Sequence, residues 1–390
     1  MSSAPYRRRA PSLTQWGAVA VAVATGLRMS QDLSWLGEWN ETGNNLMTMG
    51  ILGGMLASLC AALDAHRNGR ALHSLRSLHP ARRHPISVLI KESLDVLAWP
   101  LLGWCLVVVT CYAATAGVNP SPSHVSLWPL AAGTVFLCAQ VLGGHVAGLR
   151  LHLAFALPGI VLLGFVVPAA LGSLDGPASR LSPSLSVWIL LPSVPSTAYF
   201  GFLTLLFLSL AALLVVAMAT AVTRWSRIVA AAACVGLGAA AVSGLLEADG
   251  PTSTVAGISR MACRIGEASE VCVFPDHRRT LPQLVAAADR VNRSLPDDVR
   301  PARYVENGLV HVPEDALLST QNVPGSPGES VVEAAASWRV CDPQTSADRL
   351  DYLAVRAGFI PDVAGPGSEV LMLPPSEQIA WWREGMDSRC

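Results

Sequence analysis

Lysine is almost absent from this chain of 390 residues: Lys91 is the single lysine among 27 basic residues, and the others are arginines. A phosphate-binding loop needs a glycine-rich run that ends in Gly-Lys-Ser or Gly-Lys-Thr. Lys91 is instead preceded by Ile90 and followed by Glu92. We therefore expect that the chain does not hydrolyse ATP by itself. The preference for arginine is typical of a GC-rich genome.

Several other signatures of chemistry are missing as well. The chain has no GxSxG, HExxH or dinucleotide glycine fingerprint, and no CxxC or HxxxH spacing accompanies its cysteines. It also lacks a basic patch with interleaved aromatic residues, which argues against nucleic-acid binding. The one cluster of acid, imidazole and cation, Asp276-His277-Arg278, is better interpreted as a turn and helix start with Asp276 as a surface cap. We predict no enzymatic activity, no cofactor and no metal site.

Charge is scarce too, and it is unevenly distributed. Charged residues make up 14% of the chain and hydrophobic residues 52%, whereas soluble domains are about one quarter charged. Residues 1–246 contain 14 cations and 7 anions, a net charge of +7, and residues 247–390 contain 13 cations and 21 anions, a net charge of −8. This pattern predicts a membrane part followed by a water-soluble part.

Long apolar runs define the first part, residues 1–246. They predict seven transmembrane helices at about 10–27, 45–63, 96–117, 127–148, 151–172, 200–222 and 228–246. The first run follows three arginines and is interpreted as a signal anchor because no small-residue cleavage pattern follows it. The loop at 28–41, with Trp35, Glu38 and Trp39, is expected to be external and interfacial. Gly50 and Gly54, four residues apart, mark a face for close helix packing.

The basic connector between the second and third spans orients the whole chain. Short loops rich in arginine and lysine stay in the cytoplasm, so this connector, residues 64–91, is predicted to be cytoplasmic. The spacing of Leu72, Leu75 and Leu78 predicts a short helix on the membrane face before Pro80. The connector is either a solvated loop or a docking element for a partner. The arginines of such a docking element are Arg67, Arg70, Arg76, Arg82 and Arg83.

The side on which the C-terminal part lies depends on the number of spans. Residues 184–199 are apolar but contain Pro192 and Pro195, so we predict an interfacial or re-entrant segment rather than a span. Seven spans then place the N-terminus in the cytoplasm and residues 251–390 outside the plasma membrane. Ionisable or polar residues within spans are functional candidates. Here they are Glu92, Asp95, Gln140 and His145, and for His145 a packing role competes with a proton relay.

The C-terminal part, residues 251–390, is predicted to be an α+β domain. Two short strands at 258–265 and 271–274 should form a hairpin around Gly266, and helical spacing of apolar residues predicts an amphipathic helix at 281–295. Residues 303–312 are expected to be extended, and further helices are predicted at 331–340, at 347–357 and after Pro375.

Nine cysteines divide between the two parts. Five lie in predicted spans, and the C-terminal part contains Cys263, Cys272, Cys341 and Cys390. An even number in an exported domain favours disulfides. Cys263 and Cys272 flank the predicted hairpin and are the preferred pair, and Cys341 with Cys390 follows by elimination.

One stretch of the chain resembles a known family. The sequence ASLCAALDAHRNGRALHSLRS at 57–77, followed by a proline-broken basic connector and a new span, is similar to the early part of actinobacterial ABC-2-type transporter permease-like proteins. The resemblance covers mainly residues 45–105 and implies that residues 64–85 couple to a separate ATP-binding subunit. This chain departs from the usual six spans and adds a large exported domain. Residues 263–295 also resemble an exported tail of some actinobacterial membrane proteins.

These observations predict a polytopic α-helical membrane protein with a C-terminal α+β soluble domain. Its expected role is that of a permease-like subunit of an ABC exporter, embedded in membrane lipid, driven by a separate ATPase and able to form homo- or hetero-oligomers. The alternative is a membrane-anchored envelope binding or sensing protein whose exported domain binds a ligand.

Overall fold

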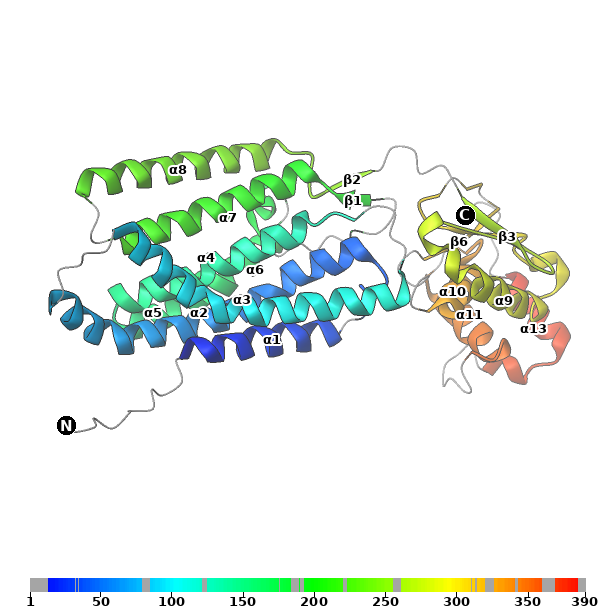
Figure 1. The fold of residues 1–390 in the computed structure, drawn as a ribbon. Helices are drawn as coiled ribbons and strands as arrows, with labels where there is room; N and C mark the ends of the chain where they lie inside the picture. Colours follow the sequence, from blue (N-terminus) through cyan, green and yellow to red (C-terminus); the bar gives the residue numbers. More distant parts are fainter. Residues whose placement is uncertain are drawn as a thin grey trace.

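The computed structural model describes most of the chain. The described residues are 13–31, 33, 35–78, 85–120, 125–174, 176–183, 189, 193–219, 223–254, 261–309, 311–312, 314–319, 326–340, 343–359 and 369–384. They form an elongated helical bundle with a smaller C-terminal domain at one end (Figure 1). The predicted pairing of Cys341 with Cys390 lies outside the described residues, as do Arg82 and Arg83.

Antiparallel helices build the bundle, and the second and third of them extend well beyond the predicted spans at 45–63 and 96–117. They are α1 (Leu13–Gln31), α2 (Trp39–Leu78), α3 (Pro85–Val118), α4 (Trp128–Arg150), α5 (Leu153–Val161) continued by the π-helical turn η1 (Leu162–Val166) and α6 (Val167–Gly172), α7 (Thr197–Met218) and α8 (Arg224–Glu247). Six stretches among the described residues are long and apolar enough to cross a membrane. The chain therefore has the features of a multi-pass membrane protein. The helix α1 is not one of the six, so a seventh span remains a prediction.

The basic connector differs from its predicted form. No separate helix begins at Leu72, because α2 runs without a break from Trp39 to Leu78, a length of 40 residues. At 1.5 Å per residue this helix is about 60 Å long. Leucines at three-residue spacing fit the continuation of an existing helix as well as a new one, and the first helix-breaking proline comes only at Pro80. Asp64 lies within this helix, and its Oδ1 accepts the N–H of Leu13 at 3.0 Å, which caps α1.

Small residues bring α2 and α4 close together. Added Cβ atoms at Gly144 and Gly148 of α4 would collide with the backbone of Ser58 and Ala62 of α2. Glycine at such positions lets two helix backbones approach each other, which favours packing within a membrane. Gly54, predicted to lie on a packing face of α2, abuts Gln140 and Leu137 of α4. The pair α2 and α4 therefore forms the centre of the bundle.

Part of the ambiguous apolar segment at 184–199 forms a strand. Ser193–Pro195 is strand β1, and it pairs in antiparallel register with β2 (Thr252–Thr254), which follows α8. Most of residues 184–192 lie outside the described part, so the predicted re-entrant form is not tested. The pairing joins the start of α7 to the end of α8 at the same end of the bundle as the C-terminal domain (Figure 1).

The C-terminal domain contains one mixed sheet in the order β3-β4-β5-β6. Its strands are β3 (Ala262–Ile265), β4 (Glu270–Val273), β5 (Arg303–Glu306) and β6 (Ala316–Leu318). The first pair is antiparallel and the other two pairs are parallel. The helices are α9 (Leu281–Arg293), α10 (Pro327–Ser337), α11 (Pro343–Arg356) and α13 (Pro375–Glu384).

The sequence predicted the α+β class, the hairpin and the first helix of this domain. The helix α9 begins at Leu281 as predicted, because its apolar residues recur with helical spacing and pack on the sheet. The helix α10 begins at Pro327 rather than at 331, since a proline at the first helical turn is well tolerated. Strand β6 was not predicted, because three residues are too few to show alternation.

Candidate functional site

A dense polar segment opens α2 at the end of the bundle that faces the C-terminal domain. Asn40, Glu41, Thr42 and Asn44 are all buried there. Buried polar groups must find hydrogen-bond partners, and Glu41 finds them: one carboxylate oxygen accepts the N–H of Ile189 at 2.6 Å and the other accepts Nδ2 of Asn45 at 2.9 Å. This segment therefore ties the connection at Ile189 to α2.

Glu38 immediately precedes the first residue of α2 and belongs to the loop at 28–41 that was predicted to be external and interfacial. It is only 5% exposed. Its backbone carbonyl accepts hydrogen bonds from both the N–H and the hydroxyl of Thr42, each at 2.8 Å. The side-chain carboxylate lies near the positive end of the helix dipole, which stabilises negative charge.

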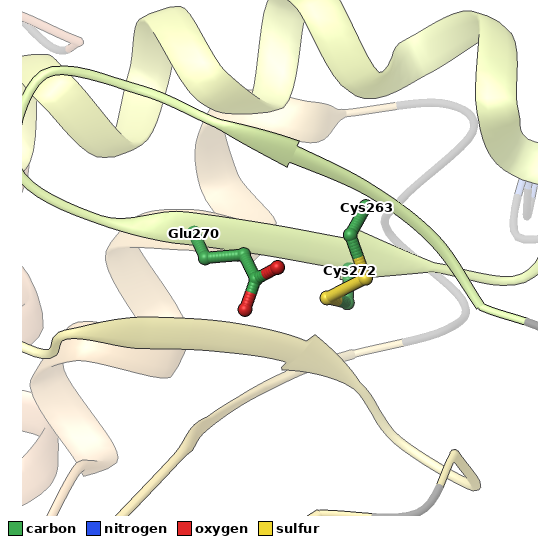
Figure 2. Close-up of side chains that lie close together, drawn as sticks. All are labelled: Cys263, Glu270 and Cys272. Atoms are coloured by element: carbon green, nitrogen blue, oxygen red, sulfur yellow. A yellow bond between two sulfur atoms is a disulfide. The ribbon is translucent and has the colours of Figure 1, made fainter.

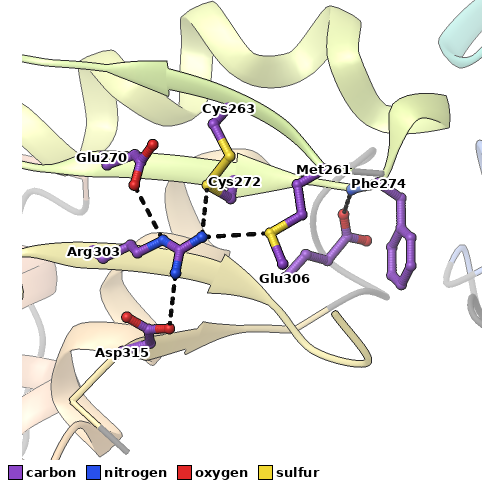
Figure 3. The surroundings of a disulfide bond; sticks show 8 residues. All are labelled: Met261, Cys263, Glu270, Cys272, Phe274, Arg303, Glu306 and Asp315. Carbon is purple, nitrogen blue, oxygen red and sulfur yellow. Dashed lines mark hydrogen bonds and ion pairs between the residues drawn. A yellow bond between two sulfur atoms is a disulfide. The ribbon is translucent and has the colours of Figure 1, made fainter. Parts of the chain in front are cut away.

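The partner of Glu38 comes from the C-terminal domain. His277 lies in the 3₁₀ turn Pro275–Thr280 that follows β4, and it is 2% exposed. Its Nε2 is 3.0 Å from Oε1 of Glu38, and its Nδ1 is 2.6 Å from Oε1 of Glu306. Glu306, at the end of β5, is fully buried and accepts the N–H of Phe274 at 2.9 Å through Oε2 (Figure 3). We call Glu38, His277 and Glu306 the junction cluster.

Electrostatics determine where the junction cluster keeps its proton. Burial by itself would lower the pKa of His277, but the carboxylates of Glu306 and Glu38 outweigh that effect and hold the pKa well above its usual value. Burial raises the pKa of Glu306, and the neighbouring imidazole opposes this rise. At neutral pH His277 is therefore an imidazolium clamped between two carboxylates. The arrangement can hold or release one proton, and it fastens two parts of the chain together.

The sequence singled out His277 but assigned it the wrong neighbours. The prediction grouped it with Asp276 and Arg278 in a surface turn, and the turn is present. However, alternate residues of the turn face different ways, and His277 points into the junction, toward Glu306 and Glu38. Both carboxylates were missed, because 239 residues separate Glu38 from its partner and no local spacing reports such a contact. The buried polar run after Glu38 was the available signal.

The predicted docking arginines and intramembrane acids are only partly described. Arg67 is exposed on α2. Arg70 and Arg76 lie on the same helix and Glu92 lies on α3, but their side chains are outside the described set. Asp95 is exposed near the start of α3, and His145 is buried in α4. Among those with described side chains, Arg67, Asp95 and His145 do not form one cluster.

Gln140 has a definite structural role. Pro168 has no N–H, so the carbonyl of Gly164, four residues earlier, lacks its usual helical donor. Nε2 of Gln140 donates to that carbonyl at 2.6 Å, which agrees with the expectation that neighbouring helices satisfy the backbone near prolines in spans. The defect coincides with η1, whose π-helical hydrogen bonding also accommodates the missing donor. Gln140 thus fastens the α5–α6 span to α4.

One other group of side chains has metal-ligand chemistry. This group consists of Cys263, Glu270 and Cys272 (Figure 2). Each residue offers one possible ligand atom, and these three atoms lie within 4.8 Å of one another. The two cysteines form a disulfide, as predicted, and a disulfide leaves no thiolate to bind a metal. Glu270 is also engaged in an ion pair with Arg303, whose Nε lies 3.1 Å from Oε2 of Glu270. The described geometry therefore does not support a metal site here.

Comparison with known proteins identifies no relative: no family model, curated protein or solved structure matches this chain. Its function must be argued from its own residues.

The role of Gln140 gives a prediction about stability. Replacing Gln140 by Leu removes the donor to Gly164 and should lower the free energy of unfolding in detergent by about 1 to 2 kcal/mol. Pro168→Ala restores a backbone N–H four residues after Gly164 and should recover most of this loss in the double variant. Thermal unfolding of the four proteins measures the coupling, and strictly additive effects would contradict the assignment.

The junction cluster predicts a pH dependence with a definite sign. The pKa of His277 is raised in the folded protein. Its contribution to the stability of the junction cluster is therefore complete below about pH 6.5, the unperturbed pKa of histidine. It is lost as pH rises through the raised pKa, when Glu38 and Glu306 face each other without a cation. Amide exchange at residues 35–42 should therefore accelerate at alkaline pH in excess of the intrinsic base-catalysed rate.

Two variants test whether His277 causes this change. His277→Gln should show fast exchange at residues 35–42 at every pH, and Glu38→Gln should weaken the pH dependence because the repulsion between carboxylates is gone. His311→Gln, at an exposed histidine of the same domain, serves as the control and should behave like the parent. A pH response that persists in His277→Gln would assign the effect to another group.

Proposed function

We propose that this protein is a permease-like membrane subunit that couples a separate cytoplasmic ATP-binding subunit to an exported C-terminal domain. The observation that carries the proposal is the continuity of α2. Glu38 of the junction cluster directly precedes this helix, and its other end bears Arg67, Arg70 and Arg76. A single helix of about 60 Å thus joins the contact with the C-terminal domain to the basic connector.

A rigid helix of this kind transmits movement. Displacement of the connector by a partner would shift α2 along or about its axis, and Glu38 would move relative to His277. Because α2 packs closely on Gly144 and Gly148 of α4, α4 would move with it. Closure of the ATP-binding partner would then change both the helix packing and the grip on the exported domain, as alternating access requires.

A second function uses the same connection in the opposite direction. In a sensing protein, a ligand or a change in external pH would act on the C-terminal domain and the signal would pass inward through α2. The observation that favours this alternative is the titratable histidine at the junction, whose charge holds two buried carboxylates together. The two functions differ in the partner at the cytoplasmic end.

Purification of the tagged full-length protein from its host in mild detergent, with mass spectrometry of the proteins that accompany it, tests the proposal. We expect an ATP-binding subunit that is lost after the triple reversal Arg67→Glu, Arg70→Glu and Arg76→Glu. The matched control reverses Arg264, Arg293 and Arg356, which are exposed on the C-terminal domain, and should retain the partner. Recovery of a regulatory protein without an ATPase would support the sensing alternative instead.

The proposal also requires that the two ends of α2 lie on opposite sides of the membrane. Arg293→Cys should add labelling by a membrane-impermeant maleimide in intact cells, measured against the parent protein. Arg67→Cys should add labelling only after permeabilisation. The reverse pattern would place the C-terminal domain in the cytoplasm and overturn the coupling scheme.

A further inference from the structure

The disulfide of the C-terminal domain has one accessible and one inaccessible sulfur. Cys263 and Cys272 lie directly opposite each other in β3 and β4. Cys263 is exposed on the edge strand, whereas Cys272 is fully buried. Thiol–disulfide exchange requires access of the attacking thiolate to one sulfur. An incoming thiol can therefore reach Cys263, and Cys272 would be the leaving group.

A cation lies beside the leaving sulfur. Nη2 of Arg303 is 3.5 Å from Sγ of Cys272 (Figure 3). Two carboxylates hold the guanidinium in this position: Glu270 is 3.1 Å from its Nε and Asp315 is 3.5 Å from its Nη1. A neighbouring arginine stabilises a thiolate, and a better stabilised thiolate leaves faster. The arrangement thus favours cleavage of the disulfide with Cys272 as the leaving thiolate.

We propose that Cys263–Cys272 is a thiol–disulfide exchange site rather than an inert cross-link, and that its reaction partner is a dithiol, such as an exported redox protein. The first thiolate of the partner bonds to Sγ of Cys263, and the electron pair of the S–S bond passes to Cys272 beside Arg303. The second thiolate of the partner then attacks the mixed disulfide. Cys263 leaves as a thiolate, the partner becomes a disulfide, and two protons convert the cysteines to thiols.

The position of the disulfide gives the reaction a structural consequence. Strand β3 is the edge of the sheet, and it pairs only with β4 in the described sheet. It is also the first strand of this sheet after the last membrane helix, α8. Reduction removes the covalent link between β3 and β4, so the attachment between the sheet and α8 becomes more mobile. The redox state would therefore change how firmly the domain is held.

The rate of reduction tests the proposal. The full-length protein in detergent is treated with dithiothreitol, and thiols are alkylated and counted by mass spectrometry over time. Arg303→Gln should slow reduction about tenfold, because the departing thiolate loses its neighbouring cation. Arg293→Gln, at an exposed arginine of α9, should react at the parent rate. Brief treatment with glutathione should place the adduct on Cys263 and not on Cys272.

A second variant separates electrostatics from general loosening of the sheet. Glu270→Gln removes a carboxylate that neutralises Arg303, so it should accelerate reduction. A purely structural disulfide predicts that both variants loosen the sheet and both react faster. Three outcomes would each overturn the proposal. They are reduction of Arg303→Gln at or above the parent rate, reduction of Glu270→Gln at or below the parent rate, and a glutathione adduct on Cys272.

Discussion

A buried imidazolium between two carboxylates is the contact on which the arrangement of this protein depends. Glu38 and Glu306 are both buried, and removing a charge from water is expensive unless it is paired. His277 lies within ion-pair distance of both carboxylates, one from the bundle and one from the C-terminal domain. The domain is thus held at the end of the bundle by a contact whose strength varies with protonation, unlike an apolar interface.

The same need to satisfy polar groups shapes the bundle itself. Pro168 removes a backbone donor within a span. The side-chain amide of Gln140 on the neighbouring helix and a π-helical turn compensate for this loss. Glu41 accepts a hydrogen bond from the backbone N–H of Ile189 at the end of the bundle near the C-terminal domain. In lipid no water is present to replace such partners. At these two places a specific side chain supplies the missing hydrogen bond and links neighbouring parts of the bundle.

The sequence predicted the features that depend on local patterns, such as helices and the hairpin. It did not predict contacts between residues that are far apart in the chain. Hydropathy located the helices of the bundle but not the full lengths of α2 and α3, which extend well beyond the predicted spans at 45–63 and 96–117. Helical spacing found Leu281 as the start of α9. The hairpin cysteines were paired correctly because their positions about Gly266 are a local property. The contact of Glu38 with His277 was not predicted, since only the fold brings these two residues together. The connector was misjudged because its leucine spacing is equally consistent with a longer α2.

The length of α2 gives these observations a common meaning. One uninterrupted helix begins beside Glu38 and continues into the basic segment. Movement of either end changes the distance between Glu38 and His277, and a charge-dependent contact responds steeply to distance in a buried setting. In the proposed coupling, the helix and the junction cluster act as one mechanical element, and the disulfide acts on the other attachment of the domain, through β3.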